Sequence, residues 1–277
     1  MLASKLAYVG GGVIDQVEGL GRFTRFTGAT WEWFFRGMLI IRRWMLLMPQ
    51  LFQIGTKSIP VVMAVGAFMG MVLGVEAYDQ FAAIGQAARL GGVINISVVK
   101  QVGPVLAAVM IAGRVGGSVS AELGTMRVTE QLDALRVMGT DPIAYLVVPR
   151  VLACIIMLPL LTVFSDLLGM AGGYFVTVYG YDVNATAYWD FSARFVRPWD
   201  VFTGLFKSIV FGLMIGLISC YKGFNCRAGA EGVGRAATDA FVTSFLAIIA
   251  SNLFLAKFFK DLSFVIFGHS SMSAFSG

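Results

Sequence analysis

The stretch "IPVVMAVGAFMGMVLGVEAY", Ile59 to Tyr78, decides the fold of this chain. It has no charged residue before Glu76. It is also about as long as the roughly 20 residues that a helix needs to cross the hydrocarbon core of a bilayer. The stretch therefore predicts a transmembrane helix.

Four further apolar stretches have a similar length. The chain has 277 residues, of which 57% are hydrophobic and only 13% are charged, so it has too little polar surface to enclose a water-soluble core. We expect an all-α polytopic membrane protein with about five transmembrane helices. The other four expected spans are about Val93 to Ser118, Val151 to Tyr179, Val201 to Tyr221 and Ala240 to Phe259.

The segment ahead of the first span is apolar but also basic. "WEWFFRGMLIIRRWMLLMPQLF", Trp31 to Phe52, contains Arg36, Arg42 and Arg43 among Trp, Phe and Leu residues. A spanning helix would bury these arginines, so an interfacial helix is expected instead. The sequence thus predicts an N-terminal cytoplasmic or interfacial helical segment over residues 1–57 and a transmembrane domain over residues 58–277.

The distribution of Lys and Arg predicts the orientation. Of the 21 basic residues, seven lie before or at Lys57, four between Arg114 and Arg150, and three between Lys222 and Arg235. Basic connecting segments face the cytoplasm, so the amino terminus is expected inside and the carboxyl terminus outside. These basic clusters flank apolar runs, which favours lipid headgroups over nucleic acid as their partner.

One connecting segment is amphipathic. "VTEQLDALRVMGTDP", Val128 to Pro142, has helical spacing and ends in Gly139 and Pro142. One stripe of this helix is apolar (Val128, Leu132 and Leu135), and pairs at i, i+3 lie on its other faces (Arg127 with Glu130, Asp133 with Arg136). It is either a linker resting on headgroups or a docking helix for a cytoplasmic partner. Periodicity alone does not choose between them.

The chain carries no recognisable catalytic machinery of its own. A phosphate-binding loop followed by Lys and Ser or Thr does not occur, and "GAEGVG", Gly229 to Gly234, lacks the lysine. His269 is the single histidine, and the three cysteines show no metal spacing. We therefore expect no nucleotide site, cofactor or metal on this chain.

Polar residues near the outer ends of the first two expected spans form a candidate lipid site. In it, Lys100 would attract a headgroup phosphate while acyl chains lie against the apolar members; the alternative is a pair of rim charges. Lys207 is expected to snorkel to the outer surface. Asp166 is the only acid well inside a long apolar run. The candidate lipid-binding residues are Met69, Leu73, Glu76, Tyr78, Lys100 and Gln101.

Several motifs together resemble the MlaE-type (YrbE-type) permease family. The resemblance covers most of the chain from about Phe52 to Leu255. The motifs are "GMVLG" (70–74), "QVGPVLAAVMIAGRVGGSVSAELG" (101–124) with its continuation to Pro142, "PRVLACIIMLPLLTVFSDLLGMAGG" (149–173), "KSIVFG" (207–212) and "GAEGVGRAATDAFVTS" (229–244).

The resemblance implies a homodimeric transmembrane subunit of an ABC lipid transporter in the cell inner membrane. A separate cytoplasmic ATPase would bind ATP and Mg, and an MCE lipid-binding protein would join outside. The cargo would be phospholipid or a similar lipid, with a role in outer membrane lipid asymmetry. Gln101 stands where the family commonly has an acidic residue. A coupling helix is expected at about 122–139, and the candidate ATPase-coupling residues are Glu122, Arg127, Glu130, Leu132, Asp133, Leu135, Glu231 and Arg235.

Two other classes of function stay open from the residues alone. The first is an ion- or proton-coupled secondary transporter of a hydrophobic substrate, a class that usually shows intramembrane carboxylates or broken helices. The second is a membrane scaffold without transport. Copurification of an ATPase, together with ATP-dependent lipid transfer, would separate the three.

Overall fold

The computed structural model describes residues 2–37 and 44–267, and the side chains of 17–36 and 45–266 among them. Every regular element in these ranges is a helix. In chain order they are α1 (Leu2–Gly37), α2 (Trp44–Ile54), η2 (Thr56–Ser58), α3 (Ile59–Ala83), η3 (Ala87–Arg89), α4 (Leu90–Ser97), η4 (Val98–Val102), α5 (Gly103–Ile111), η5 (Ala112–Gly116), α6 (Gly117–Val128), α7 (Gln131–Val137), η6 (Ile143–Val147), α8 (Val148–Tyr174), η7 (Phe175–Gly180), α9 (Ala185–Phe195), α10 (Pro198–Phe224) and α11 (Ala230–Phe267).

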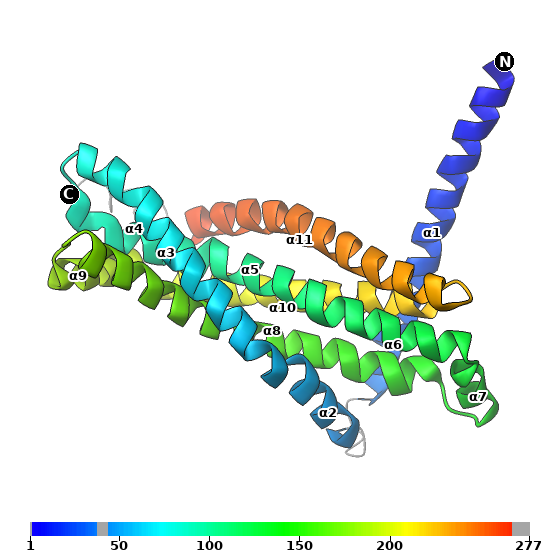
Figure 1. Ribbon diagram of the computed structural model, residues 1–277. Helices are drawn as coiled ribbons and strands as arrows, with labels where there is room; N and C mark the ends of the chain where they lie inside the picture. Colours follow the sequence, from blue (N-terminus) through cyan, green and yellow to red (C-terminus); the bar gives the residue numbers. More distant parts are fainter. Residues whose placement is uncertain (1, 38–43, 268–277) are drawn as a thin grey trace.

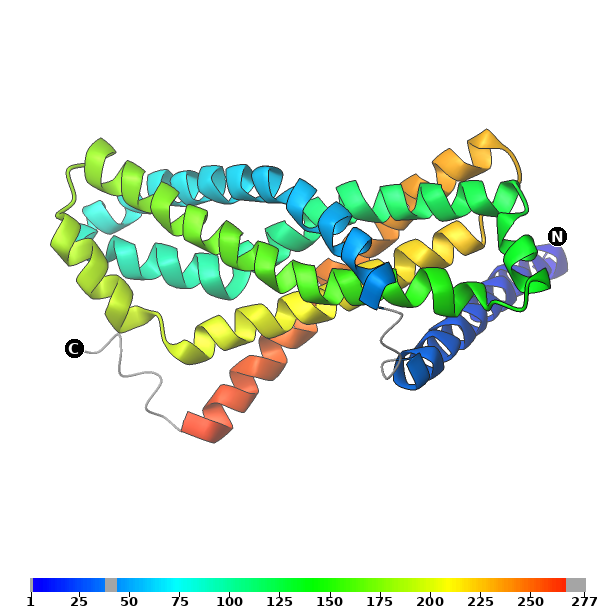
Figure 2. The same ribbon diagram turned by 90° about the horizontal axis from the view of Figure 1, so that it is seen from below.

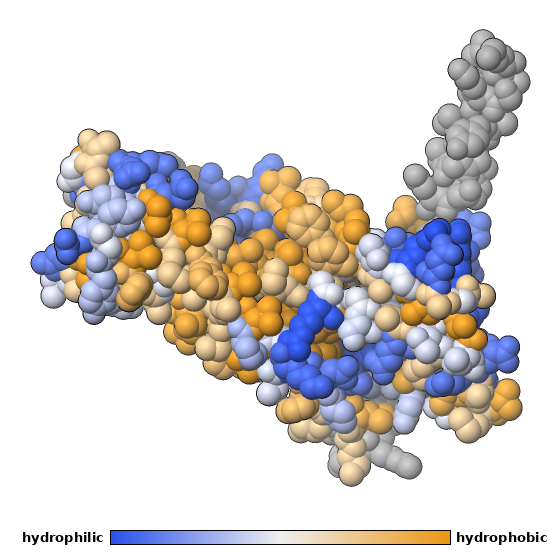
Figure 3. Space-filling view, viewed as in Figure 1, coloured by the Kyte–Doolittle hydropathy of each residue, from blue (hydrophilic) through white to orange (hydrophobic). Residues whose placement is uncertain are grey.

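The prediction of five spans is confirmed. Within the described ranges, five helical stretches are long and apolar enough to cross a membrane: Met45–Ala83, Ala87–Val128, Ile143–Gly180, Pro198–Phe224 and Ala230–Ile266. They form an elongated bundle with α9 at one end and α7 at the other (Figure 1). Its visible surface is a broad apolar belt between more hydrophilic ends (Figure 3), as expected for helices packed in lipid.

The boundaries predicted for the interfacial helix were wrong. Trp31 to Phe52 is divided between α1, which ends at Gly37, and α2, which continues through η2 into α3. The reason is that α2 carries no charged residue, so it can extend the first span. Arg42 and Arg43, which motivated the prediction, lie outside the described residues.

Helix α1 runs across the bundle axis near its α7 end (Figure 1). Phe23 and Phe26 pack edge-on against Tyr221 of α10, with ring centroids 5.1 and 5.6 Å apart. Trp33 Nε1 also donates a hydrogen bond to Asp141 Oδ2 over 2.8 Å. Aromatic contacts and this bond therefore fix the second half of α1 to the bundle.

Small residues allow α3 and α8 to approach closely. A Cβ added at Gly70 would overlap the backbone of Gly169, and one added at Gly66 would overlap Ser165. Such small residues at intervals of four let membrane helices meet at backbone distance. The two matching series are Gly66, Gly70 and Gly74 on α3, and Ser165, Gly169 and Gly173 on α8.

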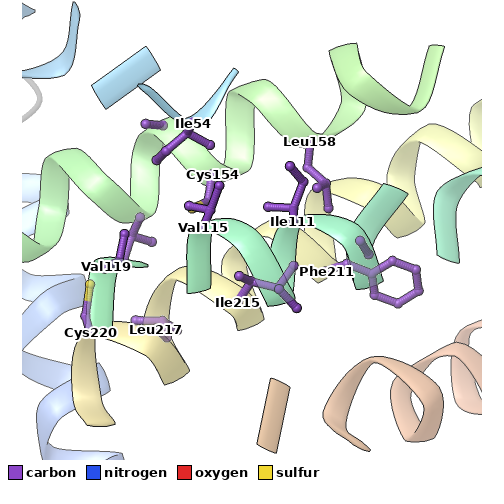
Figure 4. Packing of buried hydrophobic residues seen from close by; sticks show 14 of the residues in the cluster. Ile54, Ile111, Val115, Val119, Cys154, Leu158, Phe211, Ile215, Leu217 and Cys220 are labelled. Carbon is purple, nitrogen blue, oxygen red and sulfur yellow. The ribbon is translucent and has the colours of Figure 1, made fainter. Parts of the chain in front are cut away.

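The largest apolar cluster lies towards the α7 half of the bundle. In Figure 4, Ile54 of α2, Ile111 of α5, Leu158 of α8 and Phe211 of α10 meet there, each at most 1% exposed. Helix α11 contributes less to the core, since only 11% of its most apolar 18-residue stretch is buried. Its carboxyl-terminal half diverges from the other helices (Figure 2).

At the opposite end, hydrogen bonds among three buried side chains join α9 to α4. The Tyr188 hydroxyl donates to Asn95 Oδ1 over 3.1 Å, and Asn95 Nδ2 donates to Ser192 Oγ. Burial raises the pKa of Tyr188 to about 12, although its bond to Asn95 acts in the opposite direction. These hydrogen bonds join α9 to α4 at this end of the bundle.

Candidate functional site

A polar cluster lies where η4 packs against α10, towards the α9 end. Lys100 Nζ forms an ion pair with Asp200 Oδ1 at 3.0 Å; the Lys100 side chain is 48% exposed and that of Asp200 only 7%. The second carboxylate oxygen of Asp200 accepts from the Arg197 backbone N–H over 3.2 Å. Asp200 thus caps the start of α10 while it holds Lys100.

Lys207 completes this cluster from inside the bundle. Its side chain is 2% exposed, and its Nζ donates to Gln101 Oε1 over 2.7 Å and to the Lys100 carbonyl oxygen over 3.2 Å. The expectation that Lys207 snorkels to the surface was therefore wrong, because the amide of Gln101 and a backbone carbonyl solvate it within the protein.

Local backbone geometry makes this arrangement possible. Lys100 and Gln101 lie in the π-helical turn η4, a wider turn that is frequent at functional sites. Gly204 lies between Asp200 and Lys207 on α10, and a Cβ there would overlap the Val99 carbonyl. A glycine at this position lets α10 approach η4 closely enough for both contacts.

The cluster has an excess of positive charge. It contains two ammonium groups, on Lys100 and Lys207, and one carboxylate, on Asp200. Gln101 contributes a neutral amide. We call Lys100, Gln101, Asp200 and Lys207 the polar cluster; it is suited to attracting an anion, and half-exposed Lys100 is its accessible member.

The remaining candidate lipid residues do not join the polar cluster. Tyr78 stacks on Tyr181 with ring centroids 3.9 Å apart, and Leu73 packs beside the small apolar cluster around Leu90. Met69 is half-buried and Glu76 is exposed, both on α3. The structure thus keeps Lys100 and Gln101 in the polar cluster and places the other four along α3, where Leu73 and Tyr78 both pack against the small apolar cluster. In sequence order, those four are Met69, Leu73, Glu76 and Tyr78.

Sequence reasoning left Asp200 and Lys207 out of the site. They are seven residues apart on α10, so they lie two turns apart on the same helix face. This spacing can be read from the sequence, but it does not show which helix packs against that face of α10. Asp166 of α8 is also buried, and Gly103 leaves the room that its carboxylate occupies.

At the α7 end, the expected helix of about 122–139 is divided. Glu130 has a φ of 59°, in the left-handed region, so α6 ends at Val128 and α7 begins at Gln131. The predicted pairing of Arg127 with Glu130 is therefore not formed, because these residues no longer share a helix. The predicted pair of Asp133 with Arg136 is confirmed at 2.8 Å.

Two of the three residues in the predicted apolar stripe of this segment face inward. Leu132 is fully buried in the main apolar cluster of this chain, and Leu135 is half-buried. Val128 is 37% exposed, and the most exposed apolar residues of the segment are Val137, at 88%, and Met138, at 70%. Leu132 therefore anchors α7 to its own bundle, and Val137 and Met138 form the accessible apolar surface.

Three of the other charged coupling candidates form ion pairs. Glu122 Oε1 pairs with Nη2 of buried Arg150 at 2.9 Å, which joins α6 to α8. Glu231 and Arg235 pair at 2.9 Å on α11. The last two line an open cavity of about 620 Å³ between the end of α10 and the start of α11.

No group of three or more His, Cys, Asp or Glu side chains that could hold a metal occurs within the described ranges; His269 lies outside them. Burial raises the pKa of the Cys226 thiol, whereas Arg127 lowers it. These observations, with the five spans, define a multi-pass helical membrane protein whose features suit binding and movement.

The comparisons give the family. A model described as "Permease MlaE" matches residues 47–258, which is more than half of the chain. The chain is 42% identical over 259 residues to a probable ABC transporter permease protein of Rickettsia felis, covering 94% of this chain and 99% of that protein. The chain therefore belongs to the MlaE permease family.

Two further relatives extend the comparison. A probable ABC transporter permease protein of Synechocystis is 47% identical over 207 residues, or 75% of this chain and 79% of that protein. The chloroplastic protein TRIGALACTOSYLDIACYLGLYCEROL 1 of Arabidopsis thaliana is 38% identical over 218 residues, or 78% of this chain and 62% of that protein. As an ABC transporter permease, the chain is not itself the ATPase and requires one as a partner, so an ion- or proton-coupled mechanism is not retained.

Proposed function

We propose that this permease moves phospholipid or a similar lipid between membranes, powered by a separate ATPase that binds ATP and Mg. Two copies of the chain would form the membrane unit, and an MCE lipid-binding protein would join the α9 end. The complex would lie in the cell inner membrane, and its α7 end would face the cytoplasm. The resemblance of the motifs to MlaE-type permeases supports these partners and this location.

The observation that carries the lipid proposal is the polar cluster. Half-exposed Lys100 is held by Asp200, and its cluster has one positive charge more than negative. A phosphate can bind there while acyl chains stay against apolar side chains. The name of the Arabidopsis relative refers to a glycolipid, which supports a lipid as the transported class.

The short helix α7 would transmit movement of the ATPase. Val137 and Met138 would enter a groove on the ATPase, since exposed apolar residues at the end of a helix are typical anchors. Leu132, buried in the bundle, and the ion pair of Glu122 with Arg150 would carry the displacement to the spans. ATP binding would then favour one of two packed states of the dimer.

The test is lipid retention by the purified complex. Lys100→Ala should lower retention of an anionic phospholipid about fivefold, because one basic group near a phosphate contributes about 1 kcal/mol, and should leave retention of a neutral sterol unchanged. Mass spectrometry of bound lipid measures both. Lys257→Ala, which removes an exposed charge of α11, serves as the control. Equal retention of both lipids by Lys100→Ala and the parent protein would remove the polar cluster from the lipid site.

A further inference from the structure

A second basic site lies at the α7 end, far along the bundle from the polar cluster. A cavity of about 270 Å³ opens between α1, the α6–α7 region and the end of α10. Four arginines line it, namely Arg22, Arg25, Arg127 and Arg136. We call it the arginine cavity.

Two of the four arginines of this cavity have no ion-pair partner among the described residues. Arg136 pairs with Asp133 at 2.8 Å, and Arg22 lies 3.9 Å from Glu18, near the limit of an ion pair. Arg25 and Arg127 form no ion pair with any described residue. Two guanidinium groups from different helices therefore remain available at one cavity.

The other walls are those of a membrane-surface site. Phe26, Ile143 and Phe224 provide apolar surface, while Tyr221 and Asn225 add polar groups. The volume is several times the roughly 30 Å³ that one water occupies, so it accommodates a phosphate with its glycerol. Helix α1 crosses the bundle axis here (Figure 1), as a helix lying along a bilayer surface does.

We infer that the arginine cavity binds the phosphate of an anionic glycerophospholipid from the membrane leaflet at the α7 end. Guanidinium groups bind phosphate oxygens through paired hydrogen bonds, and basic pockets between membrane helices are typical sites for anionic headgroups. The bound lipid joins α1 to α6 and α7. It is a resident lipid and is distinct from the cargo of the proposed function.

The test uses the complete transporter in nanodiscs of phosphatidylcholine with a minor fraction of photoactivatable phosphatidylglycerol. Crosslinks in the parent protein are expected on peptides from 17–37 and 127–143. Arg25→Gln/Arg127→Gln should lower this crosslinking about 30-fold for the loss of two basic groups. Arg36→Gln/Arg227→Gln, which removes two exposed charges outside the cavity, should leave it unchanged.

Three results would overturn the inference. The first is equal crosslinking of these peptides in the parent and in Arg25→Gln/Arg127→Gln. The second is loss of the copurifying ATPase with unchanged crosslinking, which would assign the arginines to a protein contact. The third is protection of the arginines from phenylglyoxal by inorganic phosphate in lipid-free detergent to the same extent as by phosphatidylglycerol, which would assign the cavity to a free anion.

Two further experiments keep the test decisive: the single arginine variants, and the arginine variants in the Lys100→Ala background. If the double variant does not reach the membrane, the single variants Arg25→Gln and Arg127→Gln should each lower crosslinking about fivefold. The crosslinked positions lie at the α7 end, so the result is independent of Lys100→Ala. An effect of the arginines in the Lys100→Ala background would support the cavity even if the proposed lipid transport failed its own test.

Discussion

Lys207 is a buried ammonium group within the fourth span, and its solvation depends on one neutral side chain. Gln101 Oε1 accepts its shortest hydrogen bond, at 2.7 Å. A charge in this position is costly unless nearby groups satisfy it. The identity of residue 101 therefore determines both the stability of the fourth span and the charge of the polar cluster.

Gln101→Glu should separate these two effects. A carboxylate would convert the bond to Lys207 into a charge-assisted one, so we expect stabilisation of about 1 kcal/mol. The same change cancels the excess positive charge, so retention of anionic phospholipid should fall. Thermal unfolding in detergent and mass spectrometry of retained lipid measure the two quantities.

Gln101→Leu supplies the opposite case. It leaves Lys207 with the Lys100 carbonyl alone, and the unsatisfied donor should cost about 2 kcal/mol of stability. Gln80→Leu, at an exposed position of α3, controls for the loss of an amide. The proposed role of Gln101 fails if the Leu and Glu variants unfold at the same temperature.

The sequence predicted some of these residues and missed others for a physical reason. The charge of Lys100 beside the apolar second span was visible from the sequence, as was its neighbour Gln101. Asp200 and Lys207 are about 100 residues away along the chain, and only the packing of α10 against η4 brings them to Lys100. Hydropathy and spacing carry no information about that contact.

At the scale of elements, α7 shows the same limit. The periodicity of Val128, Leu132 and Leu135 correctly indicates a helix with one apolar face, yet it does not say what covers that face. In the structure, Leu132 packs into the bundle, and the left-handed Glu130 turns α7 away from the axis of α6. The exposed pair that follows, Val137 and Met138, which we propose as the docking surface, was therefore not predicted from the sequence.

Replacing that exposed pair tests α7 as the coupling element. Val137→Asp/Met138→Asp should still insert, because neither side chain is buried. Placing charge at two apolar anchors should weaken ATPase binding at least about 30-fold. Copurification of the ATPase and ATP-dependent lipid transfer should both be lost. A variant that keeps its ATPase would show that α7 is only a linker on the headgroups.

Leu132→Asp is the contrasting variant. It would place a carboxylate in the apolar cluster of the chain itself, so the yield of folded protein should fall before any docking can be measured. Ile84→Asp, at an exposed apolar position near the end of α3, should retain both yield and ATPase. The three results together distinguish a docking surface from a core contact.

For the whole molecule, the five spans were predictable because each is a long apolar run, and a helix satisfies its own backbone within lipid. The tilt of these helices and the choice of which helices pack together were not predictable in this way. They depend on where small residues let two backbones meet, as Gly70 and Gly169 do between α3 and α8, and on how small a share of α11 is buried.

The distribution of charge predicts the orientation of the molecule, and this prediction can be measured. The α7 end carries the arginine cavity and the charged α10–α11 connection, so it should face the cytoplasm.

Single-cysteine labelling tests this orientation. In a Cys226→Ser background, Cys154 and Cys220 remain buried, so the labelling of a single cysteine introduced at an exposed position can be measured. Gln86→Cys lies in the connection after α3, and Ala228→Cys lies in the connection before α11. A membrane-impermeant maleimide added to spheroplasts should label Gln86→Cys at once and Ala228→Cys only after permeabilisation. Labelling of Ala228→Cys alone in intact spheroplasts would reverse the orientation, and it would place both the ATPase surface and the arginine cavity on the wrong side of the membrane for the mechanism proposed.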